Sequence, residues 1–455
     1  MSADAAARRR ARVTWRWVEL RMMLPLLILL PVGFAATNIY RTASADTGPM
    51  FLAAIYIVMM LAAHFVLVAT GNRGDPLLLP LVAVIGGIGL VMLNRLAPDL
   101  GSTSAFGLNL NVAQTQLLWF GVGLLAMLTI AIGLRDDRFL RHYKYTWALA
   151  GIALLIFTFL FGTEVNGARL WIYLGPIGFQ PTEFIKIVLV LFIAGYLAEH
   201  RALLRDASLR LGPIRMPPLP YLLPMLAIFV LVMLVVIVGK DLGTALLFFG
   251  IFLTMLFVAT GRRSYVLIGL LLFLAGSFVA SRLFEHVARR VDAWLDPFAD
   301  PSGAGYQTVQ ALYAFGRGGL FGEGLGQSLL PTTGGRFFGV ETDFIFAVIA
   351  EELGVIGACG LLAVTLALVF RGLRVAILAR DDFSAMLAVG LTVSLGLQTL
   401  IITAGIVKLI PLTGITFPFV SYGGSSLLAS FIIIGLLLAI SHRSAVAAER
   451  DRGGP

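Results

Sequence analysis

The chain has 455 residues, of which 59% are hydrophobic and only 13% carry a charged side chain. A soluble domain carries roughly 25% charged residues, so this chain has too few to cover a surface that faces water. Its formal net charge is +9, but the basic residues lie in short segments between apolar runs, which is typical of membrane topology and not of nucleic-acid binding. The single cysteine excludes an intramolecular disulfide, and one cysteine with five scattered histidines excludes a structural zinc site.

The apolar runs approach 20 residues, enough for a helix to cross a hydrocarbon layer ~30 Å thick. We therefore expect an all-α polytopic membrane protein with about twelve transmembrane helices. The first run follows a basic stretch and has the features of a secretory signal, but a first transmembrane helix is favoured because spanning runs continue throughout the chain. The expected spans are 22–40, 50–70, 77–95, 116–134, 146–162, 182–198, 221–239, 242–260, 265–282, 346–370, 384–408 and 426–441.

Lys and Arg residues concentrate in alternate connecting segments, and the positive-inside rule then places both termini in the cytoplasm. The expected organisation is a basic cytoplasmic tail (1–21), N-terminal transmembrane helices (22–115), a transmembrane core (116–443) and a second cytoplasmic tail (444–455). The longest polar segment, 282–343, then lies outside the cell. Loops longer than ~12–15 residues are usually functional or disordered, and the aromatic residues of this one argue for order, with short helices at the membrane interface.

Two carboxylates in this loop, Asp296 and Asp300, are each followed by proline. Proline disfavours helix for the residue before it, so both Asp residues should lie on extended or turn backbone with side chains free to reach a ligand. Gly303 and Gly305 then allow a ligand to approach the backbone closely. The alternative is a purely structural role, because Asp-Pro commonly starts a turn.

Further along the loop, the string GEGLG within 316–326 weakly resembles a phosphate-cradling loop. No strand precedes it and no GK[ST] follows, so a nucleotide site is a weak interpretation.

Ionisable residues are rare within the expected spans. Glu183 and Lys186 begin the sixth span three residues apart, which places them on one helix face within pairing distance. Lys240 and Asp241 occupy a very short turn between the seventh and eighth spans, and Lys408 ends the eleventh. Charges at membrane depth are costly and usually functional, whereas interfacial snorkelling is the structural alternative.

The segment Ser421, Tyr422, Gly423, Gly424, Ser425 and Ser426 leads into the last span. Ser425 or Ser426 could cap that helix, and the amides of a helix start also suit an anionic group such as a diphosphate. Glu351 and Glu352, near the outer end of the tenth span, are either solvated or line a cavity. The lone His64 in an apolar span is interpreted as structural.

Six motifs occur in order and together resemble the SEDS family, the RodA, FtsW and SpoVE proteins of cell shape, elongation, division and sporulation. The resemblance covers roughly 117–443, and the family usually has about ten spans, so this chain has two extra N-terminal helices before a SEDS-like core. The motifs are GARLWIYLGPIGFQPTEFIKI (167–187), DLGTALL (241–247), DPSGAGYQ (300–307), GRGGLFGEGLGQS (316–328), TDFIFAVIAEELGVIG (342–357) and PLTGITFPFVSYGGSS (411–426).

The resemblance implies a peptidoglycan glycosyltransferase of the plasma (inner) membrane, which polymerises lipid II into glycan strands at the outer face. It implies membrane lipids and a class B penicillin-binding protein as partners, and no nucleic acid. Two other functions remain open: a lipid II flippase, and a non-catalytic scaffold for the penicillin-binding protein.

The family's essential carboxylate corresponds to Asp300, and its polar cavity to Glu183 and Lys186. A diphosphate leaving group gains negative charge, so cations must stand where that charge develops. Lys186, Lys240 and Arg317 are candidates, a divalent cation could share the task, and Ser421, Tyr422, Gly423, Gly424 and Ser425 are further candidate substrate-binding residues.

Overall fold

The computed structural model describes residues 16–42, 48–100, 102–105, 108–134, 136, 138–165, 168–175, 177–206, 209–211, 214–216, 219–330 and 339–452. Within these ranges, twelve helices are long and apolar enough to cross a membrane, which confirms the expected number of spans. They are Arg16–Ile39, Gly48–Ala69, Leu78–Leu100, Val112–Gly133, Lys144–Phe161, Thr182–Leu204, Pro220–Val238, Leu242–Thr260, Arg263–Leu283, Ile345–Ile377, Asp382–Ile406 and Gly424–Asp451.

The ends of the first and last spans differ from the expectation. The first span begins at Arg16, so the end of the expected basic tail is helical. Helix α16 (Gly424–Arg452) continues through most of the expected C-terminal tail. Hydropathy marks where an apolar run stops, but a helix can continue into water beyond that point, so the apolar limits underestimate its length.

The outward surface of several helices is apolar, as expected of a protein that has the bilayer as its solvent. Helix α11 (Arg263–Leu283) shows this most clearly, because Tyr265 is its only buried residue. Large side chains such as Leu271 and Phe278 are more than half exposed along it. A contiguous apolar surface of this kind is incompatible with water and fits contact with lipid chains. The chain is therefore a multi-pass membrane protein.

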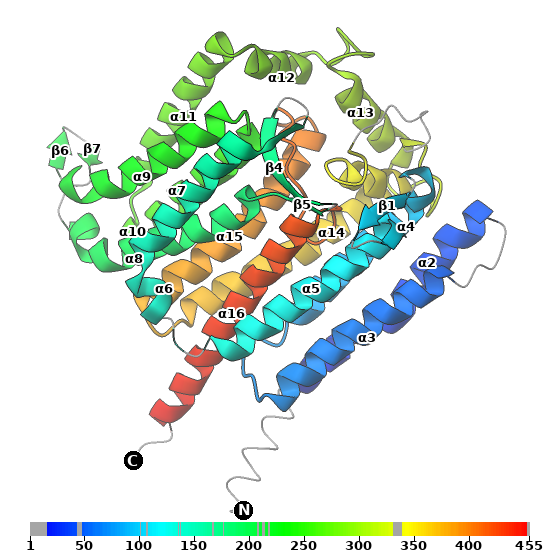
Figure 1. Cartoon of the computed structure of the whole chain (residues 1–455), viewed down its shortest axis with the longest axis horizontal. Coiled ribbons are helices and arrows are strands. Elements are labelled where there is room, and N and C mark those ends of the chain that lie inside the picture. Colours follow the sequence, from blue (N-terminus) through cyan, green and yellow to red (C-terminus); the bar gives the residue numbers. More distant parts are fainter. Residues whose placement is uncertain are drawn as a thin grey trace, which may run out of the picture. The chain divides into compact units, whose positions relative to one another are not determined.

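The chain divides into two compact units. The first consists of Met1–Arg135, Gln310–Arg380 and Thr416–Pro455. In it, α16 packs along α5, and α14 packs along α4 (Figure 1). Its elements are α2 (Leu26–Thr42), α3 (Gly48–Ala69), α4 (Leu78–Leu100), β1 (Ser102–Ala105), β2 (Leu108–Asn111), α5 (Val112–Gly133), α14 (Ile345–Ile377) and α16, and α13 (Tyr306–Gly318) ends in it.

The second unit consists of Asp136–Val309 and Asp381–Ile415. Helix α8 contacts α7, α9, α10 and α15, so it is the central helix of this unit (Figure 1). The elements are α6 (Arg138–His142), α7 (Lys144–Phe161), β3 (Thr163–Val165), β4 (Ala168–Leu174), β5 (Ile177–Phe179), α8 (Thr182–Asp206), β6 (Leu209–Leu211), β7 (Ile214–Met216), α9 (Leu219–Val238), α10 (Leu242–Thr260), α11, α12 (Glu285–Leu295) and α15 (Asp382–Ile406).

Short strands lie in the connections between helices, and the sequence analysis did not predict them. β1 pairs with β2, β4 pairs with both β3 and β5, and β6 pairs with β7, all antiparallel. Two-stranded hairpins are marginal alone and depend on neighbouring elements for stability. The expected helices of the long loop are present as α12 and α13.

Candidate functional site

The expected pair on α8 forms, and it is buried. The Lys186 ammonium lies 2.5 Å from Glu183 Oε2, and it also donates to Gln398 Oε1 of α15 at 2.7 Å. Lys186 is only 1% exposed. A buried ammonium requires a counter-charge and further acceptors, and Glu183 and Gln398 supply both. The pair therefore links α8 to α15 within the second unit.

Lys240 and Asp241 form the short turn between α9 and α10. Lys240 has a φ of 64°, a left-handed conformation that is unfavourable for a residue with a side chain. Asp241 is the N-cap of α10, where Oδ1 accepts from the Thr244 N–H at 3.0 Å. Burial raises the pKa of the Asp241 carboxyl, while its hydrogen bonds from Thr244 and the charge of Arg290 act in the opposite direction. The turn therefore holds a cation at the surface beside a buried carboxylate.

Asp296 and Asp300 lie on non-helical backbone, as the prolines after them predict. Asp296 is the C-cap of α12, with φ −135° and ψ 81°, and Asp300 lies in the turns that precede α13. Both side chains are exposed. Asp300 Oδ2 accepts from the Ala304 N–H at 2.9 Å, so this residue does take part in the turn. The turn uses only Oδ2 of Asp300, so this contact is compatible with a carboxylate that is exposed to a ligand.

Gly303 lies directly against the Asp300 carboxylate. A Cβ added to Gly303 would overlap the carboxylate oxygens and lie 2.7 Å from Asp300 Cγ. A Cβ added to Gly305 would instead overlap the backbone of Pro297. The two glycines therefore have different tasks: Gly303 leaves room for the carboxylate, and Gly305 lets the turn close.

The predicted segment 421–425 lies in the first unit, where much of its polar capacity is used internally. The Ser421 hydroxyl donates to the Thr342 carbonyl and accepts from the Phe417 N–H at 2.8 Å. The Tyr422 N–H donates to the Glu341 carbonyl at 2.8 Å, and the Gly423 N–H donates to Gln116 Oε1 at 3.3 Å.

The expected capping role of Ser425 or Ser426 is wrong. Helix α16 begins at Gly424, and the Gly423 carbonyl accepts the first helical hydrogen bond, from the Leu427 N–H at 3.0 Å. Both serines therefore lie in the first turn of the helix. A glycine is required at the start, because a Cβ on Gly424 would overlap the ring of Trp119.

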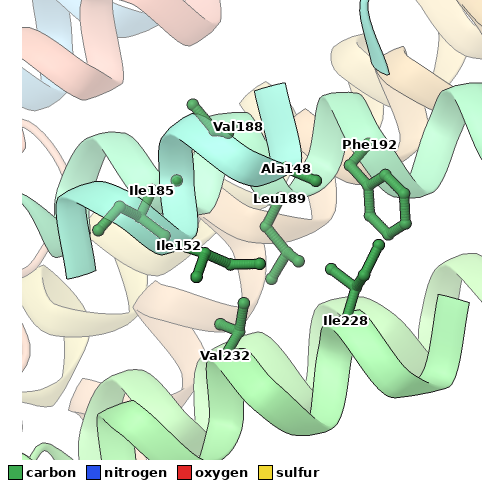
Figure 2. A pocket seen from close by; sticks show the side chains of 9 residues that line it. Ala148, Ile152, Ile185, Val188, Leu189, Phe192, Ile228 and Val232 are labelled. Carbon is green, nitrogen blue, oxygen red and sulfur yellow. The ribbon is translucent and has the colours of Figure 1, made fainter. Parts of the chain in front are cut away.

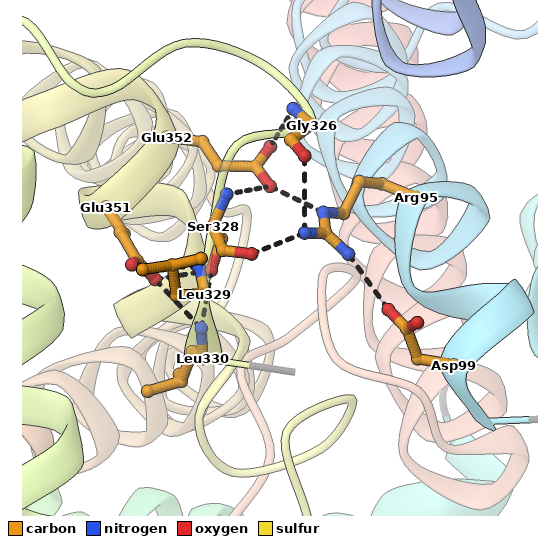
Figure 3. Close-up of polar contacts among 8 residues, drawn as sticks. All are labelled: Arg95, Asp99, Gly326, Ser328, Leu329, Leu330, Glu351 and Glu352. Carbon is orange, nitrogen blue, oxygen red and sulfur yellow. Dashed lines mark hydrogen bonds and ion pairs between the residues drawn. The ribbon is translucent and has the colours of Figure 1, made fainter. Parts of the chain in front are cut away.

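Glu351 and Glu352 are buried and so do not face solvent; they hold the loop that follows α13 (Figure 3). Glu352 accepts from the Gly326 N–H at 2.9 Å and from the Ser328 N–H at 3.3 Å. Glu351 accepts from the Ser328 hydroxyl and from the Leu329 N–H at 3.0 Å. Two adjacent buried carboxylates thus satisfy the amides of one irregular segment.

Two arginines balance these carboxylates. Arg95 of α4 lies 2.6 Å from Glu352 and 3.0 Å from Asp99, and it donates to the Ser328 carbonyl at 2.6 Å (Figure 3). Arg317 Nε lies 2.7 Å from Glu351 Oε1. Arg317, expected to meet a diphosphate, therefore already has a carboxylate partner.

The phosphate-cradle interpretation of GEGLG is wrong, because its amides are already used. Helix α14 breaks at Gly354, which has a φ of 69°. The break frees the carbonyls of Glu351 and Glu352, and these accept from the N–H groups of Glu323 and Gly324, both at 3.0 Å. The glycines of this stretch instead permit close packing on α14: a Cβ on Gly322 would overlap the Glu352 backbone.

A small apolar gap with a free volume of about 10 Å³ lies between α7, α8 and α9 (Figure 2). No charged side chain lines it, and it has room for little more than a water molecule, so it is a packing gap and not a ligand site. Ile185 of its lining is next to Lys186 in sequence. The lining residues are Ala148, Gly151, Ile152, Ile185, Val188, Leu189, Phe192, Ile228 and Val232.

The sequence left open a divalent cation that shares the neutralisation of the diphosphate. Among the described residues, no group of three or more His, Cys, Asp or Glu side chains is placed to hold a metal ion.

Sequence reasoning missed Gln398 and Arg95. Gln398 is a neutral amide in an apolar helix, and its partner Lys186 is far away in the sequence. Arg95 lies at the end of a span, where a lone arginine is ordinarily interpreted as interfacial. Only the folded chain shows that both are buried and which groups they contact.

The buried pair gives a first prediction. Lys186→Met should lower the free energy of unfolding by about 3–5 kcal/mol, because Glu183 is left buried without a counter-charge. The double variant Glu183→Gln/Lys186→Met should recover much of that loss. Thermal unfolding of the purified protein in detergent measures both, and equal stability of Lys186→Met and the wild type would contradict the prediction.

Gly303 gives a second prediction. Gly303→Ala should leave the protein folded, because only a flexible carboxylate has to move, but it should displace Asp300 and lower glycan synthesis at least tenfold if that carboxylate acts as a base. Gly316→Ala is the matched control, since a Cβ there meets no atom within 4 Å. Unchanged synthesis by a folded Gly303→Ala protein would show that the position of the carboxylate is unimportant.

Named relatives cover almost the whole chain. Peptidoglycan glycosyltransferase RodA of Mycobacterium tuberculosis is 43% identical over 427 residues, which are 92% of this chain and 90% of the relative. Stage V sporulation protein E of Bacillus subtilis is 34% identical over 383 residues, which are 81% of this chain and 97% of the relative.

Solved structures share the fold. A chain from a peptidoglycan synthase complex, described as coordinating polymerization and crosslinking, matches with a TM-score of 0.63 and 29% identity over 82% of this chain and 98% of its own. The rod shape determining protein RodA of Thermus thermophilus matches with a TM-score of 0.56 and 28% identity, over 84% and 99% of the two chains. The family model for cell cycle proteins of the FtsW, RodA and SpoVE type matches residues 75–446. The chain belongs to the FtsW/RodA/SpoVE family.

Proposed function

We propose that this protein, a peptidoglycan glycosyltransferase, polymerises lipid II into glycan strands at the outer face of the plasma membrane, for cell elongation or division. The names of its relatives support the reaction class. The observation that carries the proposed site is Asp300, an exposed carboxylate on a turn in which Gly303 leaves room for it.

The proposed reaction is a glycosyl transfer in which the Asp300 carboxylate acts as general base. It takes the proton of the acceptor sugar's hydroxyl as that oxygen attacks the anomeric carbon of the donor. The bond from that carbon to the diphosphate oxygen breaks, and the lipid diphosphate leaves with the bonding electrons. General-base assistance of this kind contributes about 10²–10⁴-fold in rate.

The leaving diphosphate needs positive charge or hydrogen-bond donors near it. Among the predicted cations, Lys240 has the charge most available to an anion, because it is exposed and has no carboxylate within salt-bridge distance among the described residues. Lys186 and Arg317 are each paired with a glutamate, so their charges are largely compensated. Glu183, Lys186, Arg317 and the segment 421–425 remain candidate substrate-binding residues on the basis of the sequence.

A partner that crosslinks the strands is part of the proposal. One structural relative comes from a complex whose description names both polymerization and crosslinking. Glycan strands need crosslinks to form a wall, and a class B penicillin-binding protein is the partner that we propose for this chain.

Purified protein with lipid II in detergent tests the proposed function. The wild type should release glycan strands longer than the disaccharide, and Asp300→Asn should lose at least 100-fold in rate while inserting into the membrane normally. Asparagine preserves the turn contact to Ala304 but cannot accept a proton at neutral pH. The matched variant Asp296→Asn should keep most of its activity.

The outcomes separate the alternatives. Lipid II that crosses vesicle membranes without product formation would favour a flippase, and neither product nor movement would favour a scaffold. Near-wild-type synthesis by Asp300→Asn would overturn the assignment of the base.

The proposed orientation, with both termini cytoplasmic, can be tested by labelling. In a Cys359→Ser background, Ser302→Cys should react with an impermeant thiol reagent in intact cells, because Ser302 is exposed and adjoins Asp300. Ser208→Cys, at a position outside the described residues that the sequence predicts to follow the sixth span, should react only after the cells are opened. The reverse pattern would place Asp300 in the cytoplasm and refute the mechanism.

A further inference from the structure

Helix α12, which leads from α11 to the Asp300 turn, has two different faces. Glu285, Arg289 and Asp292 are exposed. His286, Arg290 and Trp294 follow one another at four-residue spacing, so they share the other face. Trp294 Nε1 donates to the Lys408 carbonyl at 3.1 Å, which fixes this face against the segment that follows α15.

Two nitrogen atoms on that face are buried without a hydrogen-bond partner among the residues that the structure describes. They are His286 Nε2 and Arg290 Nη1. Buried polar atoms are nearly always paired, so an unpaired one points to a missing partner such as water, an ion or a ligand. Arginine is the stronger indication, because its charge remains whatever the pH.

A third unpaired atom belongs to the same neighbourhood. Asp241 Oδ2 is buried and has no partner in the described part of the chain, while Oδ1 caps α10. The charge of Arg290 acts on Asp241, and the charges of Lys240, Arg290 and, least of the three, Arg289 act on His286. Burial followed by these cations lowers the pKa of the His286 imidazole.

A single ligand that paired all three atoms would need two kinds of polar group. Arg290 needs an acceptor, and an anionic one is preferred beside a second cation, Lys240. Asp241 Oδ2 needs a donor, which a fully ionised phosphate lacks and a sugar hydroxyl supplies. A neutral sugar alone would leave Arg290 and Lys240 without an anion. A sugar joined to phosphate supplies both an anion for these cations and a hydroxyl donor for Asp241 Oδ2.

We propose that the half-buried face of α12 that carries His286, Arg290 and Trp294, together with the α9–α10 turn, forms a subsite for a glycosyl diphosphate. The diphosphate oxygens accept from Arg290 and His286, Lys240 adds charge at the rim, and a sugar hydroxyl donates to Asp241 Oδ2. The identity of the lipid that carries this group rests on the proposed function. The subsite itself is a binding site and is distinct from the Asp300 carboxylate.

Binding can be measured without turnover in the full-length Asp300→Asn protein, with lipid II as the probe. Arg290→Gln should raise the Kd for lipid II roughly 10-fold or more, as expected for loss of a charge-assisted hydrogen bond. Arg289→Gln is the matched control: it makes the same change of charge on the exposed face of the same helix, and it should change the Kd less than about twofold.

Inorganic diphosphate, as a second probe, separates recognition of the diphosphate from recognition of the sugar. It also shows whether the subsite binds a free diphosphate as well as one attached to a lipid. Inorganic diphosphate should compete with lipid II in the wild-type subsite and lose this ability in Arg290→Gln. Asp241→Asn keeps the cap on α10 but replaces the Oδ2 acceptor with a donor. It should weaken lipid II binding without weakening competition by inorganic diphosphate, because the cations that hold the diphosphate remain.

Three results would overturn the subsite: unchanged lipid II binding by a folded Arg290→Gln protein, equal losses in Arg290→Gln and Arg289→Gln, or equal losses for both probes in Asp241→Asn. If Arg290→Gln does not fold, Arg290→Lys is measured in the same way. It should bind more weakly than the wild type because the two-pronged donor is lost, and wild-type affinity would refute the inference. Because binding is read without turnover, failure of the subsite is distinguishable from failure of the wild type to polymerise lipid II.

Discussion

The second unit depends on one constraint, the need to neutralise an ammonium group that is buried inside an apolar helical bundle. Lys186 meets it through Glu183 on its own helix and Gln398 on α15. Because an unpaired charge at this depth would be very costly, α8 and α15 have one favourable register relative to each other. α10 packs against both helices, so its N-terminus with Lys240 and Asp241 has its position set by the same constraint.

In the first unit the buried charges that need neutralising are negative instead of positive. Two buried carboxylates, Glu351 and Glu352, are balanced by Arg317 and Arg95, and their remaining oxygens accept from the loop amides. The break at Gly354 adds backbone carbonyls to this set of acceptors. The backbone amides of the glycine-rich segment 322–326, which resembles a ligand-binding loop, are thus hydrogen-bonded mainly to groups of α14. In the Asp300 turn, by contrast, glycine clears space around a carboxylate that remains exposed.

The spans and the Glu183–Lys186 pair were predictable because they depend on local information, namely apolar run length and the geometry of residues three apart on a helix. The backbone at Asp296 and Asp300 was predictable from proline sterics. Helix ends, the start of α16 and the partners of Glu351 and Glu352 were not, since they depend on groups distant in sequence, as the contact of Arg95 with Glu352 shows. The half-buried face of α12 was missed for the same reason: His286 and Arg290 look like ordinary polar loop residues until the fold encloses one nitrogen of each.

The central claim is that lipid II binds at the turn that carries Asp300. Phe298 lies on that turn and is 53% exposed, whereas Phe139 of α6, in the same unit, is 58% exposed and lies in a connection that we place on the cytoplasmic side. Photoreactive p-benzoylphenylalanine at each position, followed by illumination with labelled lipid II, compares the two sites directly. The account predicts a covalent adduct at position 298 and none at 139. No adduct at 298, or equal adducts at both positions, would contradict it.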